Sequence, residues 1–339
     1  MRSLSSVAVA VLLSTLLTSA VQAEPVKIRI GWNVVPSNMA SIAWAEPKTV
    51  GMKYSGVSYI AEPIRFPGGG TQLTALASGQ LDIGMGSPTL FVQGVRNAGL
   101  NMRLIANVLN DPCDGQTYSQ AFWVRNDSGL KTAADLKGKI IAISAIGSGN
   151  DTSLNMALAK AKLTSKDVTK IEVGVGAVPA FLKEKKVDAG FLLPQFEDEM
   201  EKAGFHRLFR QCDSLGPVEM ISHFATAEYI AKNRSALVDM MADLMHATRW
   251  FYDPKNRSEA LRIASTASKQ PRESFEPWMF TKQDYGRDMN LMPDLKGFQA
   301  SIDQAVEFGV IKAGLTTVPT YVDLSVIQDA RKKLDGAVK

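Results

Sequence analysis

Small and polar residues cluster at the points where four helices are predicted to begin. The clusters fall at residues 32–37, 68–72, 86–89 and 145–152, each directly after a run that predicts a β-strand. The first turn of a helix presents unpaired backbone N–H groups and a partial positive charge, and glycines let a ligand approach them closely. The pattern therefore indicates a site for an anion or another hydrogen-bond acceptor, although each cluster alone is also explained as a turn with a helix cap.

The cluster at residues 147–152 (GSGNDT) does not match a nucleotide-binding motif. Thr152 stands where the dinucleotide motif G-x-G-x-x-G has its third glycine, and no Gly-Lys-Ser/Thr follows to make a P-loop. Asp151 in this cluster has two interpretations. As an N-terminal cap it is ordinary, whereas in a cleft it would repel an anion and favour an amine or another hydrogen-bond donor.

The residues needed for common enzyme mechanisms are absent or scattered. The sequence contains neither G-x-S-x-G nor H-E-x-x-H, and the histidines His206, His223 and His246 do not have metal-ligand spacing. We therefore predict a binding protein with no catalytic residue, no metal and no cofactor.

Alternating strand-like and helix-like segments must position the polar clusters. Apolar runs such as residues 27–31 and 81–85 predict strands, and a second such series occupies residues 121–212. From residue 227 onward, helical periodicity replaces the strands. This order predicts α/β layers on parallel sheets, with the carboxyl ends of the strands facing a ligand crevice.

The first 23 residues differ from the rest of the chain. Arg2 precedes an apolar run at residues 7–17, which is too short to span a bilayer, and residues 21–23 (VQA) offer a small-residue cleavage site. We predict a cleaved signal peptide over residues 1–23 and a periplasmic protein; the alternative is an uncleaved anchor. No cysteine follows to carry a lipid, so a lipoprotein is not expected. A formal net charge of +4 with interspersed signs gives no nucleic-acid-binding patch.

Four segments of the chain resemble a known family. They are residues 28–31 (IRIG), 66–84 (FPGGGTQLTALASGQLDIG), 130–139 (LKTAADLKGK) and 187–194 (VDAGFLLP). Together with the signal peptide, they resemble the periplasmic solute-binding proteins of nitrate, sulfonate and taurine ABC importers. The resemblance covers essentially the whole mature chain.

The resemblance implies a two-lobed type II periplasmic-binding-protein fold of the α/β class. Each lobe would be a mostly parallel sheet flanked by helices, and two crossover segments would join the lobes. Lobe one would comprise residues 24–113 and 220–339, and lobe two residues 114–219. The ligand-binding positions that the resemblance implies are Trp32, Asn33, Gly70, Thr71, Gln72, Ser87 and Thr89 in lobe one, and Ser148, Asn150, Asp151, Thr152, Pro194, Gln195 and Phe196 in lobe two.

The chain has two cysteines, Cys113 and Cys212. In an oxidising compartment they could form a disulfide or remain two inert thiols, and the sequence alone is compatible with both. The resemblance places them in neighbouring crossovers, near residues 110–120 and 211–223, and so favours a disulfide.

The resemblance also implies a function. Members of this family close on a solute and deliver it to a membrane permease, so we expect a monomer that binds a small molecule and docks transiently on an ABC permease. The polar clusters supply neutral side chains and backbone N–H groups, without an arginine at the matched positions. We therefore expect a small organic anion of the sulfonate, taurine or nitrate type.

Three alternatives stay open. The ligand could be a pyrimidine or another neutral or aromatic molecule, and the protein could serve a sensor rather than an importer. The superfamily also contains an iron-dependent enzyme that makes the thiamine pyrimidine, but that enzyme resembles a cysteine-rich, cytosolic variant of this fold. Two cysteines and a signal peptide fit it poorly.

Overall fold

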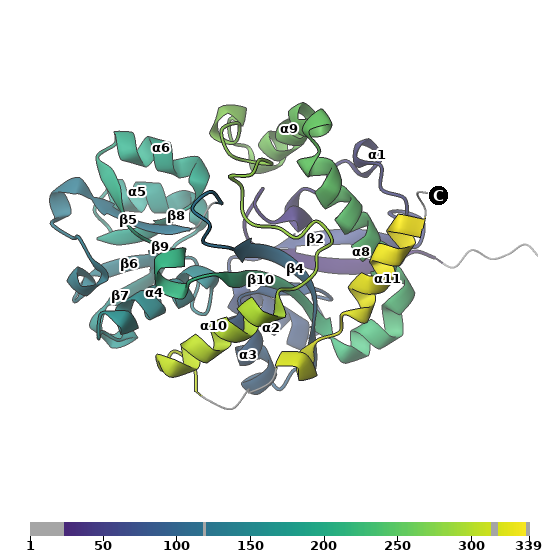
Figure 1. The fold of residues 1–339 in the computed structure, drawn as a ribbon, viewed down its shortest axis with the longest axis horizontal. Coiled ribbons are helices and arrows are strands. Elements are labelled where there is room, and N and C mark those ends of the chain that lie inside the picture. Colours follow the sequence, from purple (N-terminus) through teal and green to yellow (C-terminus); the bar gives the residue numbers. More distant parts are fainter. Residues whose placement is uncertain (1–23, 118–119, 313–317, 337–339) are drawn as a thin grey trace, which may run out of the picture.

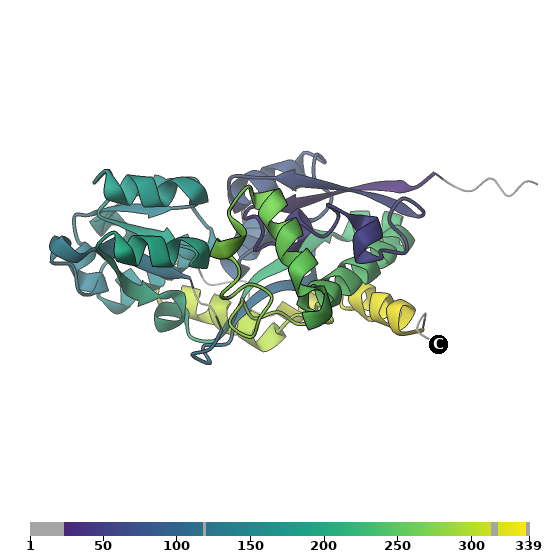
Figure 2. The same cartoon turned by 90° about the horizontal axis from the view of Figure 1, so that it is seen from above.

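The computed structural model describes residues 24–117, 120–312 and 318–336. Its elements form two lobes that lie side by side in both views (Figures 1 and 2). The signal peptide expected over residues 1–23 lies outside the described residues. Among the residues that are described, no helix is both long enough and apolar enough to cross a bilayer.

Lobe one is built on strands from both ends of the chain. β1 and β2 pair in parallel, and β3, β10 and β4 form a three-stranded sheet in which β10 is antiparallel to both neighbours. A parallel bridge between Ile30 and Ile83 connects the two sheets. The strands are β1 Val26–Trp32, β2 Tyr59–Arg65, β3 Gly84–Gly86, β4 Met102–Asp111 and β10 Val218–Thr226.

Lobe two has a five-stranded sheet in the order β7-β6-β8-β5-β9, in which β5 is antiparallel to both neighbours. Its strands are β5 Ala121–Arg125, β6 Ile140–Ile143, β7 Thr169–Glu172, β8 Ala189–Leu192 and β9 Phe205–Arg210. The expected, mostly parallel strand direction is thus confirmed in both lobes, with one antiparallel strand in each lobe, β10 and β5. Each of these strands is the first after a crossover. A parallel connection within a lobe requires a covering helix, and a strand that enters from the other lobe has no such connection, so it can run antiparallel.

Helices cover the faces of both sheets (Figure 1). They are α1 Pro47–Val50, α2 Gly69–Ala77, α3 Pro88–Arg96, α4 Gly149–Lys160, α5 Val178–Lys183, α6 Pro194–Lys202, α7 Gln211–Leu215, α8 Ala227–Tyr252, α9 Arg257–Ser268, α10 Leu295–Glu307 and α11 Ser325–Gly336. Short 3-10 helices occupy Met39–Ser41, Asn126–Ser128, Ala133–Leu136, Ser165–Asp167, Val175–Ala177, Pro254–Asn256, Arg272–Ser274 and Val318–Tyr321.

The C-terminal helices return to lobe one. α10 packs on β10 and α3, and α11 packs on α8. Arg234 of α8 donates to the Asp329 carboxylate of α11, with 2.6 Å between Nη2 and Oδ2. The return was expected from the family resemblance, and it buries the apolar faces of these helices against a lobe that is already built.

Several helix starts follow from local sequence. The Ser87 hydroxyl accepts the Leu90 N–H and Pro88 occupies the first turn of α3. Thr132 and Asp135 form a capping box. These caps depend on residues within four positions of each other, which is why the sequence reveals them.

The crossovers are shorter than expected because β4 and β10 themselves extend between the lobes. In Figure 1, one end of each strand reaches toward lobe two: the chain enters lobe two after β4 and returns from it into the antiparallel β10. Cys113 follows β4 and Cys212 lies in α7, and the structure joins them by a disulfide with Cα atoms 5.6 Å apart. The bond therefore ties the two connections between the lobes to each other.

Glu219 is a fully buried carboxyl group at this junction. It accepts hydrogen bonds from the Ser222 hydroxyl and from the backbone N–H of Asp294. Burial outweighs these bonds and raises the pKa of Glu219 to about 7.

We expect Glu219→Gln to change how stability depends on pH. The folded pKa lies above the unfolded value, so the folded state keeps a proton that the unfolded state releases, and this group lowers wild-type stability as pH rises from about 4.5 to about 7. Glutamine does not ionise. The free energy of unfolding of the variant minus that of wild type should therefore be larger at pH 8 than at pH 5 by roughly 2–3 kcal/mol.

Urea unfolding at both pH values measures this difference. Glu201→Gln, at an exposed glutamate of α6, is the matched control and should follow wild type. Parallel pH profiles for Glu219→Gln and wild type would contradict the prediction.

Candidate functional site

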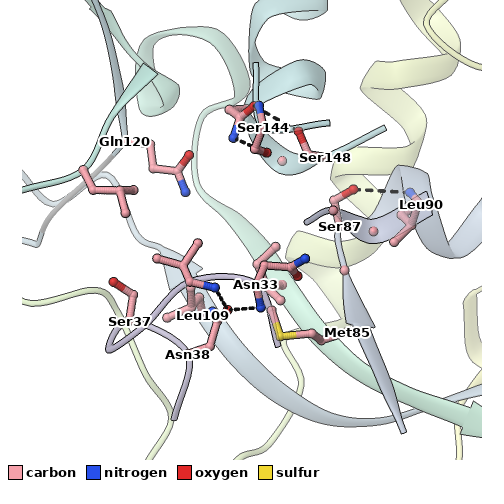
Figure 3. Close-up of a pocket in the computed structure, with 18 of the residues that line it drawn as sticks. Asn33, Ser37, Asn38, Met85, Ser87, Leu90, Leu109, Gln120, Ser144 and Ser148 are labelled. Carbon is pink, nitrogen blue, oxygen red and sulfur yellow. Dashed lines mark hydrogen bonds between the residues drawn. The ribbon is translucent and has the colours of Figure 1, made fainter. Parts of the chain in front are cut away.

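A cavity lies between the two lobes, with a volume of about 70 Å³ for the centres of water-sized molecules. On that measure one water needs roughly 10–15 Å³, so the cavity has room for a solute of only a few heavy atoms. Figure 3 shows the residues that surround it. They are Asn33, Val34, Ser37, Asn38, Gly68, Gly69, Met85, Gly86, Ser87, Leu90, Leu109, Gln120, Ser144, Ser148, Gly149, Asn150, Leu193, Ile221 and Tyr285.

Four helices begin at this cavity. The lining includes the N-cap residues Gly68 of α2, Ser87 of α3, Ser148 of α4 and Leu193 of α6. Gly68, the N-cap of α2, has no side chain, so this helix start has no side-chain hydrogen bond from its N-cap residue. Each helix start adds a partial positive charge, and four of them at one cavity make it attractive to an anion.

The described residues that line the cavity are all uncharged. None is an arginine or lysine that would supply a full positive charge, and none is a carboxylate that would cancel the helix dipoles. An anion here would be held by backbone N–H groups and neutral side chains.

An amide network fixes the lobe-one wall. Asn38 Oδ1 accepts the backbone N–H groups of Asn33 and Val34 at 3.0 and 2.8 Å. Gln72 is fully buried; its Nε2 donates to Asn33 Oδ1 at 2.8 Å and its Oε1 accepts the Met85 N–H at 3.0 Å. Gln72 thus positions two lining residues without lining the cavity itself.

A second network fixes the lobe-two wall. Asn150 Oδ1 accepts from the Ser144 N–H at 2.9 Å and the Ser148 hydroxyl at 3.0 Å, and its Nδ2 donates to Ser144 Oγ at 2.9 Å. The side chains of these residues therefore present a preorganised polar surface at the start of α4.

The lobes are closed against each other beside the cavity. The Thr89 and Thr152 hydroxyl oxygens are 2.7 Å apart, and the Ser87 hydroxyl donates to the Gly147 carbonyl at 3.2 Å. Gly68 lies so close to Ala145 that a Cβ atom added to it would be 2.2 Å from the alanine Cβ. These contacts separate the cavity from solvent on this side.

Asp151 faces away from the cavity, so it is not the cleft residue that one of its two interpretations made it. Its carboxylate pairs with the Lys170 ammonium at 2.6 Å and accepts the Gly147 N–H at 2.8 Å, while Ser148 provides the N-cap. Both side chains of the ion pair are almost fully buried. Asp151 therefore neither repels an anion in the cavity nor supplies a partner for an amine there.

The structure brings some of the expected ligand positions to the cavity and not others. Asn33, Ser87, Ser148 and Asn150 line it. Thr89, Asp151 and Thr152 line a neighbouring groove instead, and Pro194, Gln195 and Phe196 line a third one. Trp32, Gly70, Thr71 and Gln72 are absent from the cavity lining, and the Trp32 ring packs under the Arg65 guanidinium, 5.9 Å from it.

Sequence reasoning missed the residues that come from outside the four clusters. Gln120 and Ile221 lie at the crossovers, and Leu109 lies in β4. Tyr285 reaches the cavity because Asn110 donates to the Gly286 carbonyl at 2.7 Å. The position of Gln120 in an expected crossover could have indicated its role, because a chain segment that joins two lobes borders the cleft between them. No local sequence pattern indicates that Tyr285 reaches the cavity.

Known proteins were compared with this chain at the level of sequence and of structure. None of the curated protein sequences matches it significantly. Among solved structures, the alkanesulfonate-binding protein SsuA from Xanthomonas axonopodis pv. citri, bound to MOPS, matches with a TM-score of 0.68 and 20% identity, over 89% of this chain and 99% of its own. The periplasmic nitrate-binding protein NrtA from Synechocystis PCC 6803 matches with a TM-score of 0.71 and 17% identity, over 92% and 90%. The desulfurization enzyme DSZB matches with a TM-score of 0.59 and 12% identity, over 91% and 99%.

These matches confirm the two-lobed fold that the family resemblance implies. At such low sequence identities they show the fold alone. The family rests on a separate finding. The model of the NMT1-like family matches residues 21–265, well over half of the chain. The chain therefore belongs to the NMT1-like family.

Proposed function

We propose that this protein is the extracytoplasmic solute-binding component of an ABC importer, and that it captures a small organic anion and delivers it to a membrane permease. The proposed ligand class, a small anion, rests on one observation about the cavity. Four helices begin there, and among the described residues no charged side chain lines it. Sulfonate and nitrate binding by proteins of the same fold supports this class. The cavity volume favours a short alkyl group over an aryl group.

Closure of two lobes on the solute supplies the mechanism. In the closed structure, the lobe-one N–H groups of α2 and α3 and the lobe-two N–H groups of α4 surround the same cavity. A ligand that contacts both lobes stabilises the closed form over the open form, and a permease that recognises the closed form can then distinguish loaded from empty protein.

The lining also supports binding rather than catalysis. It contains no histidine, cysteine, lysine or carboxylate among the described residues. The serines and Tyr285 of the lining would need such a group beside them as a base before they could act on a substrate, and the described part of the lining supplies none.

Ligand-dependent thermal unfolding tests the proposal. We expect ethanesulfonate, acetate or nitrate to raise the midpoint, because a ligand at 100 times its Kd adds about 2.7 kcal/mol to the free energy of unfolding. Uracil and ethylamine are the neutral and cationic controls. A shift with these controls and none with any anion would overturn the ligand class.

A further inference from the structure

One amide at the cavity has an oxygen without a partner. Gln120 Oε1 is buried from solvent and accepts no hydrogen bond from any residue that the structure describes. The amide oxygens of Asn33, Asn38 and Asn150 in the same lining all accept protein hydrogen bonds. A buried acceptor is normally paired, and because this oxygen lies at the cavity between the lobes, a bound molecule is in position to supply the missing donor.

The backbone holds Gln120 in place. Its carbonyl accepts the Gln211 N–H at 2.5 Å, and β5 begins at the next residue, Ala121. Figure 3 shows the Gln120 side chain extending into the pocket from the side opposite to Ser87. A ligand with its anionic group at the helix starts near Ser87 therefore presents its other end to Gln120.

The lining also determines the charge of that other end. An ammonium group would need a carboxylate, and among the described lining residues there is none. Asp151 is committed to Lys170 and faces the neighbouring groove. A hydroxyl or amide N–H, by contrast, satisfies the Gln120 oxygen without adding a charge.

We propose that Gln120 is a specificity-determining residue and that the ligand is a short anion with a neutral hydrogen-bond donor at its other end. This inference rests on the proposed anion-binding function and names the class of anion. Leu109, Leu193 and Ile221 add apolar surface to the lining, which suits a short aliphatic chain between the two ends of the ligand.

Calorimetric titration of wild-type protein with matched ligands tests the class. The sulfonate series is ethanesulfonate, 2-hydroxyethanesulfonate and 2-aminoethanesulfonate, and the carboxylate pair is propionate and 3-hydroxypropionate. We expect the hydroxylated member to bind about tenfold more tightly than its unsubstituted partner, the value of one added hydrogen bond. The amino compound should bind more weakly than the hydroxyl compound.

Two glutamine variants test the residue. Gln120→Met keeps the length of the side chain and should remove the preference for the hydroxyl, so that the two members of each pair bind with equal affinity. Gln195→Met is the matched control, because Gln195 Oε1 is also buried and has no hydrogen-bond partner in the described part of the chain, but it lines a different groove. The control should retain the preference.

The outcomes separate this inference from the function on which it rests. Equal wild-type affinity within each pair, tighter binding of the amino compound, or binding of nitrate alone overturns the inference and leaves anion binding intact. An equal loss for both pair members in Gln120→Met also overturns it, because Gln120 would then contact the anionic group. Failure of every anion to bind overturns the proposed function itself. The wild-type comparison decides the ligand class even if Gln120→Met does not fold.

Discussion

Gly68→Ala is expected to weaken ligand capture by about 100-fold or more while leaving the fold intact. The new Cβ atom would lie 2.2 Å from the Cβ atom of Ala145, which belongs to the opposite lobe and is attached directly to its backbone. Neither atom is at the end of a flexible side chain, so the lobes must move apart. The φ angle of −166° at Gly68 is extended backbone that alanine adopts freely.

The expected size follows from the population of the closed form. If closure is reduced to 1% or less, the apparent affinity for the anion falls by about 100-fold or more. Titration with the best-binding anion measures the affinity, and small-angle scattering measures whether the ligand still closes the lobes. Unfolding in urea without ligand should match wild type, because the contact exists only between closed lobes.

Gly70→Ala is the matched control for this substitution. Gly70 lies two residues further along, in the same first turn of α2, and a Cβ atom there would meet nothing within 4 Å. It should bind ligand as wild type does. Wild-type affinity in Gly68→Ala would show that the closed arrangement is not the ligand-bound one.

Removal of the disulfide is expected to have the largest effect on stability. Cys113 and Cys212 are 99 residues apart in sequence, so their bond closes a loop that contains nearly all of lobe two. In the chain-entropy model, a loop of about 100 residues contributes roughly 4–5 kcal/mol by restricting the unfolded chain. The double substitution Cys113→Ser and Cys212→Ser should lower the free energy of unfolding by about this amount.

Chemical denaturation with and without dithiothreitol measures this effect. Reduction should shift wild type to the midpoint of the double variant, and the double variant itself should not respond to the reductant. Equal midpoints for oxidised wild type and the double variant would show that the bond contributes nothing to folding stability.

The order of the elements was predictable because it depends on local patterns. Apolar runs, glycine-rich helix starts and caps such as Ser87 and the Thr132–Asp135 box are signals between residues close in sequence. The family resemblance then supplied the arrangement of these elements in two lobes. The antiparallel directions of β5 and β10 did not follow from any run of residues, because direction depends on how a strand enters its sheet.

The helix starts at the site were predictable, but their orientation was not. Ser148, Asn150, Asp151 and Thr152 all belong to the start of α4, yet Ser148 and Asn150 face the cavity whereas Asp151 and Thr152 face the neighbouring groove. Successive side chains on a helix point about 100° apart. The rotation of the helix about its axis, which packing determines, therefore decides which of them a ligand meets.

By itself, the sequence determined that polar helix starts follow the strands of two α/β series, because caps, glycines and periodicity are properties of short segments. Only the tertiary structure decided which side chains form the cavity. Gln120 and Tyr285 reach it from segments 165 residues apart, through contacts with Gln211 and with the Asn110–Gly286 bridge. Such long-range contacts form when the chain packs, and no local pattern encodes them.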